Sequence, residues 1–128
     1  MDFYREEILE HWRNPQNFGE MKKPDVVIEQ VNPLCGDEVK FFFKIKKGRI
    51  EKVSFTGSGC AISMASASML SEAVKNRRVS DLEMVTGQDV LGLVGDKITP
   101  ARLKCAFLPL EAVRKLGSSN KAKGQAFA

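Results

Sequence analysis

The chain has 128 residues, a length typical of one domain that builds its own hydrophobic core. Twenty Lys and Arg residues against 16 Asp and Glu residues give a net charge of +4, which suits acidic protein partners at least as well as nucleic acid. The basic residues are dispersed along the sequence, whereas nucleic-acid binders usually concentrate them with aromatic residues on one face, so we expect no nucleic-acid partner.

The cysteine count and the N-terminal residues indicate a protein of the reducing cytoplasm. Three cysteines leave one thiol unpaired in any disulfide scheme, which argues against a secreted framework. The N-terminal stretch is acidic and lacks the apolar core of a signal peptide. The longest uncharged run, residues 53–71, contains glycines and many Ser and Thr residues. It therefore predicts a buried strand, loop and helix, and we expect no membrane association.

The first half of the chain predicts one helix followed by three strands. Tyr4, Ile8 and Trp12 recur at helical spacing, and Asn14-Pro15 ends this helix. A β-branched run follows, and then two runs of alternating apolar residues joined by a Lys-Gly turn. The predicted strands cover residues 26–31, 39–46 and 50–56.

Helical patterns fill the second half. Residues 61–76 are rich in Ala and Ser, so this helix can pack close to a sheet. Ser80 with Glu83 has the pattern of a capping box, and Thr86 with Asp89 has a weaker variant of it.

The last helix has an expected N-cap at Thr99, followed by a proline at its first position. A proline inside a helix clashes with the carbonyl four residues earlier, so Pro109 predicts that the helix begins near Cys105 or kinks there. Residues 118–128 consist mainly of Ser, Lys, Gly and Ala and predict a disordered C-terminal tail, which leaves residues 1–117 as a single domain.

Each cysteine has sequence neighbours that suit a metal ligand. Cys35 stands in a turn with Asp37 two residues later, Cys60 ends a glycine-rich run and opens a helix, and Cys105 lies near the start of the last helix. Thiolates select zinc, Cu(I) and iron–sulfur clusters, and a helix N-terminus favours the thiolate form. Three thiolates and one carboxylate make four ligands, and the carboxylate holds a soft metal least firmly. This composition favours a site that releases its metal.

Simpler interpretations exist for the same residues. A single cysteine is more often a small buried side chain than a ligand, and a purely structural zinc site is the main alternative for the set. Asp37 argues against that alternative, because closed structural zinc sites use cysteine and histidine. His11, the only histidine, is expected to be structural, and Phe41, Phe42 and Phe43 are expected to pack in the core and on the sheet.

Three segments together resemble the signature segments of the IscU/NifU/SufU family of iron–sulfur cluster assembly scaffolds. They are Cys35-Gly36-Asp37, the run from Gly57 through Cys60 to Met69, and Arg102-Leu103-Lys104-Cys105. Residues 8–19 also resemble the N-terminal helix and turn of the family, so the similarity extends from about residue 4 to residue 116.

The resemblance implies an α+β fold, in which helices pack on one side of a three-stranded antiparallel sheet and the site lies at one tip. It implies that Cys35, Asp37, Cys60 and Cys105 hold a transient [2Fe–2S] cluster, or Zn²⁺ when no iron is present, with Asp37 as the labile ligand. Cys105 would accept persulfide sulfur from a cysteine desulfurase. Apo iron–sulfur proteins would receive the cluster, so the chain would be a scaffold or carrier rather than an enzyme.

Two departures from the IscU subtype leave an alternative function open. Lys104 stands where that subtype has histidine, as in the SufU subtype of zinc-dependent sulfur acceptors, and it could tune the Cys105 thiolate. SufU proteins carry an insertion between the second and third cysteines, for which the 45-residue separation here is too short. In the IscU subtype an Hsp70-type chaperone recognises a Leu-Pro-Pro-Val-Lys motif. Residues 98–102 differ from this motif, so such a chaperone is a doubtful partner.

Overall fold

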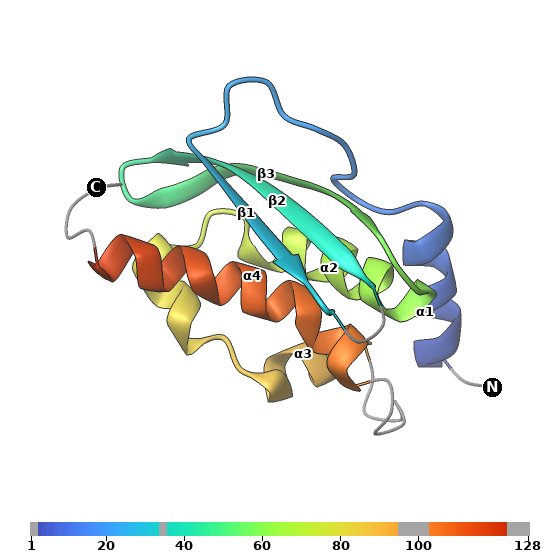
Figure 1. Cartoon of the computed structure of the whole chain (residues 1–128). Coiled ribbons are helices and arrows are strands. Elements are labelled where there is room, and N and C mark those ends of the chain that lie inside the picture. The colour runs from blue at the N-terminus through green and yellow to red at the C-terminus, as the bar shows by residue number, and fades with distance from the viewer. Residues whose placement is uncertain (1–2, 34–35, 95–102, 123–128) are drawn as a thin grey trace.

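The computed structural model describes residues 3–33, 36–94 and 103–122, and it confirms the expected α+β fold. Three antiparallel strands form one sheet in the order β1-β2-β3, the helices α2 and α4 pack against one face of it, and α3 packs against these two helices (Figure 1). In chain order the elements are α1 (Phe3–Arg13), β1 (Val26–Val31), β2 (Glu38–Lys46), β3 (Arg49–Ser58), α2 (Ala61–Val74), the 3-10 helix η1 (Val79–Met84), α3 (Gly87–Val94) and α4 (Leu103–Ala122).

The core lies between the sheet and the helices. Successive side chains of a strand point to opposite faces, and Val39, Phe41 and Phe43 therefore share the helix-facing side of β2, where they are at most 1% exposed. Phe41 contacts both Phe43 and Phe55, with ring centroids 5.8 Å apart in each pair. The predicted packing role of Phe41 and Phe43 is confirmed.

Phe42 points to the opposite face of the sheet and is nevertheless only 7% exposed. The segment between α1 and β1 lies on this side of the sheet (Figure 1). It first lies beside β3, where Gly19 N–H donates to the Phe55 carbonyl at 2.8 Å, and it ends beside β2, where the Ile45 N–H donates to Asp25 Oδ2 at 2.7 Å. The segment thus crosses the outer face of the sheet and covers the β3 edge, which would otherwise offer unpaired backbone groups (Figure 1).

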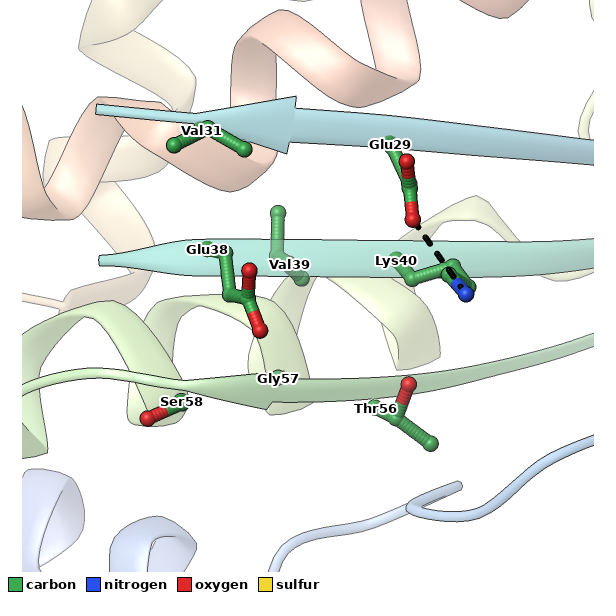
Figure 2. A pocket seen from close by; sticks show the side chains of 8 residues that line it. All are labelled: Glu29, Val31, Glu38, Val39, Lys40, Thr56, Gly57 and Ser58. Atoms are coloured by element: carbon green, nitrogen blue, oxygen red, sulfur yellow. Dashed lines mark ion pairs between the residues drawn. The ribbon is translucent and has the colours of Figure 1, made fainter. Parts of the chain in front are cut away.

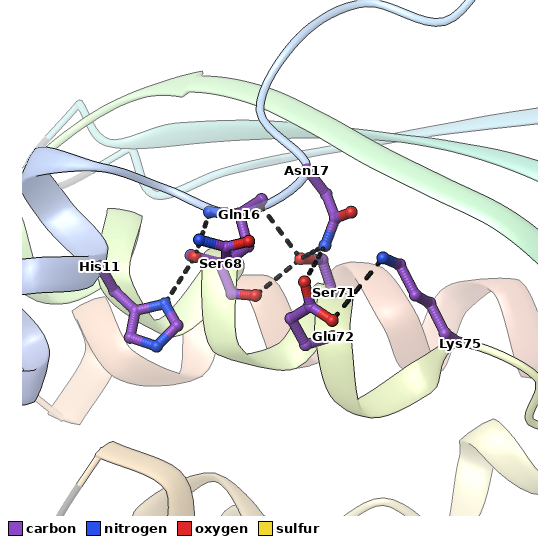
Figure 3. A network of polar contacts seen from close by, with 7 residues as sticks. All are labelled: His11, Gln16, Asn17, Ser68, Ser71, Glu72 and Lys75. Carbon is purple, nitrogen blue, oxygen red and sulfur yellow. Dashed lines mark hydrogen bonds and ion pairs between the residues drawn. The ribbon is translucent and has the colours of Figure 1, made fainter.

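A polar network joins the α1 end to the middle of α2 (Figure 3). His11 Nδ1 lies 2.7 Å from Ser68 Oγ, which also accepts the backbone N–H of Gln16 at 2.7 Å. Asn17 donates to Ser71 Oγ at 2.9 Å and to Glu72 at 3.1 Å. His11 therefore has the structural role that the sequence predicted.

One predicted helix cap is confirmed and another is wrong. The Asp89 N–H donates to Thr86 Oγ1 at 3.2 Å and the Thr86 N–H donates to Asp89 Oδ2 at 2.8 Å, which together form the reciprocal pair of a capping box. Ser80 is no N-cap, because the helix there is the 3-10 helix η1, which begins one residue earlier and follows Arg78. The 3-10 helix therefore begins before Ser80, and the serine lies within its first turn.

The helix α4 contains Pro109 and reaches Ala122. Residues 118–122, for which the composition predicted a disordered tail, therefore have helical backbone, while residues 123–128 lie outside the described part. Contacts with η1 hold this part of α4 in place. Ser118 Oγ donates to Glu83 Oε1 at 2.9 Å. Gly117 lies so close to the Glu83 backbone that a Cβ at position 117 would be 2.8 Å from the Glu83 nitrogen. The expected N-cap at Thr99 lies outside the described residues. Within them, no helix is both long and apolar enough to span a membrane.

Candidate metal centre

Asp37 enters the site from the turn that precedes β2. The turn is closed by two backbone hydrogen bonds of 2.8 Å, from Gly36 N–H to the Asn32 carbonyl and from Asn32 N–H to the Asp37 carbonyl. Gly36 has φ +77°, a left-handed conformation that suits glycine. The carboxylate of Asp37 is buried at 8% exposure, and its Oδ2 has no hydrogen-bond partner among the described residues.

Cys60 is the N-cap residue of α2 and is half-buried. The preceding Gly59 lets the Asp37 carboxylate approach, since a Cβ on Gly59 would lie 2.9 Å from Asp37 Cγ and 2.6 Å from Ser63 Oγ. The Ser63 hydroxyl donates to the Cys60 carbonyl at 3.0 Å and so stabilises the start of α2. The glycine-rich run therefore lets the Cys60 thiol and the Asp37 carboxylate lie side by side.

Cys105 lies in the first turn of α4 and is 9% exposed. The next residue, Ala106, accepts a hydrogen bond of 2.7 Å from Ser66 Oγ of α2, and both Ala106 and Ser66 are buried. This bond fixes the start of α4 against α2. Pro109 has no N–H to offer the Cys105 carbonyl, so the ordinary helical hydrogen bond is missing at this residue.

The structure brings Asp37, Cys60 and Cys105 together: one ligand atom from each lies within 4.8 Å of the other two. A buried carboxylate oxygen without a donor is costly unless a cation or a hydrogen bond compensates it. Two thiols and this carboxylate form a donor set that suits a thiophilic metal with one weaker ligand. Cys35, the fourth predicted ligand, lies outside the described residues, and its part in the site stays a prediction.

The two thiols differ in acidity. Burial raises the pKa of Cys60, but interactions with the Ser63 N–H and hydroxyl, with Cys105 and with the Ile62 N–H outweigh it, and the net pKa is lowered. Burial, together with the hydrogen bonds to Cys60 and Asp37 and the negative charges of both groups, raises the pKa of Cys105 to about 12. In the protein without a metal ion, Cys60 is thus the more acidic of the two thiols, and Cys105 keeps its proton near neutral pH.

Lys104 makes no recorded interaction with this arrangement among the described residues. Its side chain is exposed, and neither thiol owes a pKa shift to it. No ion pair joins it to Asp37 in the part of the chain that the structure describes. A tuning role for Lys104 stays a prediction that finds no support in these contacts.

The sequence did not indicate a pocket of about 300 Å³ on the outer face of the sheet, next to the site end (Figure 2). Glu38, the residue after Asp37, and Ser58, the residue before Gly59, lie at one side of the pocket. The ion pair between Lys40 and Glu29, with an N–O distance of 3.2 Å, lies at the other side. The alternation of the strands could have signalled this polar face, but only the strand register shows which residues meet on it.

Three comparisons with known proteins agree with this architecture. The chain is 34% identical to the zinc-dependent sulfurtransferase SufU of Bacillus subtilis, over 88% of this chain and 87% of the relative. It is 30% identical to the iron–sulfur cluster assembly scaffold protein IscU 1 of Archaeoglobus fulgidus, over 88% and 72%. The N-terminal part of a nitrogen-fixing NifU-like protein from Brucella abortus shares the fold, with a TM-score of 0.76 at 22% identity over 94% of this chain and 96% of that structure.

The family model gives the same result over nearly the whole length. The model of the NifU-like N terminal domain matches residues 3–124, a range that includes all three cysteines and Asp37. The signature segments, the fold and the gathered donor atoms thus lead to one conclusion: the chain belongs to the family of NifU-like N-terminal domains.

Proposed function

We propose that this protein is a scaffold on which a [2Fe–2S] cluster is assembled, with sulfur from a cysteine desulfurase, and from which the cluster passes to apo iron–sulfur proteins. The cluster is cargo in this scheme, and the protein is a carrier rather than an enzyme. The observation that carries the proposal is the buried Asp37 carboxylate: its Oδ2 has no hydrogen-bond partner among the described residues, and the Sγ atoms of Cys60 and Cys105 lie within 4.8 Å of a carboxylate oxygen. Relatives named as cluster assembly scaffolds support it.

The donor set explains how such a cargo is both held and released. Cys35, Cys60 and Cys105 would hold it through thiolates, which bind iron and zinc firmly, and Asp37 would supply the hard ligand that exchanges most readily. The lowered pKa of Cys60 reduces the free energy needed to form its thiolate when a metal binds. Cys105 must lose its proton on loading, and a cation in the site compensates that charge.

A zinc-dependent sulfurtransferase is the second candidate. The 34% identity to SufU of Bacillus subtilis and the lysine at position 104 favour it. In either scheme Cys105 would accept sulfur: its thiolate attacks the outer sulfur of the desulfurase persulfide, a new S–S bond forms on Cys105, and the desulfurase cysteine leaves as a thiolate. The raised pKa of Cys105 makes Cys60 the competing acceptor in the metal-free protein.

Anaerobic reconstitution with iron, cysteine and a desulfurase separates the two candidates. A visible charge-transfer spectrum with two irons per site or per dimer supports the scaffold. Bound zinc with sulfide release and no colour supports the sulfurtransferase. Zinc that stays bound without either sulfur transfer or cluster formation would leave a structural zinc domain and would reject both proposals.

Mass mapping of the persulfide tests the acceptor. We expect the first persulfide of the zinc-loaded protein on Cys105. An initial persulfide on Cys60, with Cys105 unmodified, would overturn this assignment and make the more acidic thiol the acceptor.

A further inference from the structure

Basic residues that are dispersed in the sequence gather at the end of the molecule opposite the metal centre. The β2–β3 hairpin meets the chain that leaves α2: Asn76 N–H donates to the Ile50 carbonyl at 2.9 Å, and Val79 N–H donates to the Gly48 carbonyl at 2.9 Å. We call the following set the basic end: Lys44, Lys46, Lys47, Arg49, Lys52, Arg77 and Arg78. The length of β2 separates it from Asp37 by roughly 25 Å (Figure 1).

The strand register places like charges directly opposite each other. Lys44 pairs with Lys52 and Lys46 pairs with Arg49 across the hairpin, and Arg49 forms an isolated bridge with Arg78. Residues directly opposite in antiparallel strands have Cβ atoms about 5 Å apart, and like charges there destabilise the sheet. An anionic group that lies across these pairs would remove this repulsion.

The basic end is only partly neutralised from within. In the described part of the chain, the ion pairs join Lys40 to Glu29 and Lys75 to Glu72, and neither includes a member of the set. The acidic residues nearby are fewer than the seven basic ones: Asp25 lies at the hairpin, Asp89 interacts with the charge of Arg77, and Glu20 and Glu51 line a pocket with Lys52. A net positive charge therefore remains available to a partner.

We propose that the basic end binds an acidic segment of a partner protein. Clustered carboxylates complement the three like-charge pairs. Proteins that bind single-stranded nucleic acid stack bases on aromatic side chains, and the basic end contains no aromatic residue. Attachment to a membrane surface usually adds exposed apolar side chains. Among the described residues the large exposed ones are Trp12, Phe18, Val27, Val31 and Met84, and none belongs to the basic end.

The position of the basic end determines what such a partner can do. A protein bound roughly 25 Å from Asp37 leaves the metal centre open to a sulfur donor or a cluster acceptor. The interaction would tether the chain while exchange proceeds at the other end. This inference does not depend on the cargo, and its test involves neither sulfur nor iron chemistry.

The test measures binding of a fluorescein-labelled peptide of Glu and Asp to the zinc-loaded full chain at low and moderate salt. Lys44→Glu with Lys46→Glu should weaken binding by on the order of tenfold, because both charges lie in the proposed contact. Arg114→Glu with Lys115→Glu is the matched control: it changes the net charge equally at exposed positions of α4, and it should change the affinity less than about twofold.

A milder pair of substitutions protects the test against misfolding. Lys52→Gln with Arg78→Gln removes charge without reversing it and should weaken binding in the same direction by a smaller factor. The Lys44→Glu and Lys46→Glu protein should melt no lower than the parent, because it places opposite charges across the hairpin.

Several results would overturn the proposal. They are the absence of peptide binding by the parent at low salt, an equal loss of affinity in the α4 control, and unchanged affinity in both hairpin variants. A single-stranded RNA or phosphatidylserine vesicles that bind more tightly than the peptide, and lose this affinity in the hairpin variants, would also reject it and assign the basic end to nucleic acid or to a membrane surface.

Discussion

Asp37 is the residue whose surroundings most resist a purely structural explanation. Its carboxylate is buried beside two thiols, one of them more acidic than usual, and Oδ2 has no donor within the described residues. A buried carboxylate destabilises the folded state unless a cation or a hydrogen-bond donor compensates its charge. Gly59 gives it the space, because a side chain there would meet Asp37 Cγ at 2.9 Å.

Removing the carboxylate should therefore affect cluster exchange more than cluster retention. We expect Asp37→Ala to assemble the cluster more slowly, to hold it longer once formed and to pass it to an apo-acceptor more slowly, because the readily exchanged ligand is missing. Changes in the ligand sphere commonly shift affinity or activity by about 10–100-fold. Transfer kinetics after reconstitution measure the effect, with the exposed Asp81→Ala as a control that should match the parent. Faster cluster loss from Asp37→Ala would indicate a static site instead.

The proton on Cys105 predicts a pH dependence of zinc binding. Because the pKa of Cys105 is raised to about 12, this thiol is protonated near neutral pH in the metal-free protein and must lose its proton when zinc binds. The apparent zinc affinity should therefore rise with pH, by about tenfold per pH unit for each proton released. Competition with a chelator between pH 6 and 8 measures the slope, and Cys105→Ser should reduce it by one proton. A flat profile in the parent would show that the thiol is already ionised.

Among the elements, the short helices show how the same motif can have different outcomes. Thr86 and Asp89 form the reciprocal hydrogen bonds of a capping box at α3, while Ser80 and Glu83 have the stronger sequence pattern and no such cap. The hydrogen bonds from the N–H and hydroxyl of Thr86 lower the pKa of Asp89. The contribution of this cap is thus present above the ordinary pKa of an aspartate and is lost as the pH falls through the lowered one.

The two caps can be compared by matched substitutions. Thr86→Ala should lower the free energy of unfolding by about 1 kcal/mol, the usual effect of losing an N-cap side chain. Ser80→Ala should change it by less than about 0.5 kcal/mol, as surface substitutions usually do. Chemical denaturation of the metal-free protein at neutral pH measures both. A larger loss for Ser80→Ala than for Thr86→Ala would mean that η1 is capped as its sequence pattern suggested.

For the whole molecule, the candidate metal centre brings together segments that are distant in the chain. Asp37 precedes β2, Cys60 begins α2 and Cys105 lies in α4, so a metal bound to them connects the sheet to two helices. A ligand that binds the folded state stabilises it, and the unfolded chain cannot bring these groups together at the same cost.

Zinc should therefore raise the melting temperature of the parent. At a free zinc concentration about 1,000 times the dissociation constant, binding stabilises the folded state by about 4 kcal/mol, and Cys60→Ser should lose most of this gain because a hydroxyl is a poor ligand for zinc. Differential scanning calorimetry with Zn²⁺ measures the shift, and Mg²⁺, which prefers oxygen ligands, is the control ion. An equal shift in Cys60→Ser would exclude this thiol from the ligand set.

The helices and strands were predictable because their signals are local. Alternation of apolar residues and helical spacing act over two to four residues, and the predicted strands 26–31, 39–46 and 50–56 lie within two residues of β1, β2 and β3 at each end. The candidate ligand residues could be named for a similar reason, since each thiol and Asp37 stands in a short, distinctive segment. The sequence by itself thus determined the elements and the chemistry available to a site.

Only the tertiary structure decided which groups meet. The sequence separates Cys60 and Cys105 by 45 residues, and the packing of α4 on α2, fixed by the Ser66–Ala106 hydrogen bond, places them together and gives the proton to one thiol. The same holds for the basic end, whose residues are dispersed in sequence but share one register across the hairpin. Distances between such groups depend on how whole elements pack and on which strand residues pair. A local sequence pattern specifies neither the packing nor the pairing.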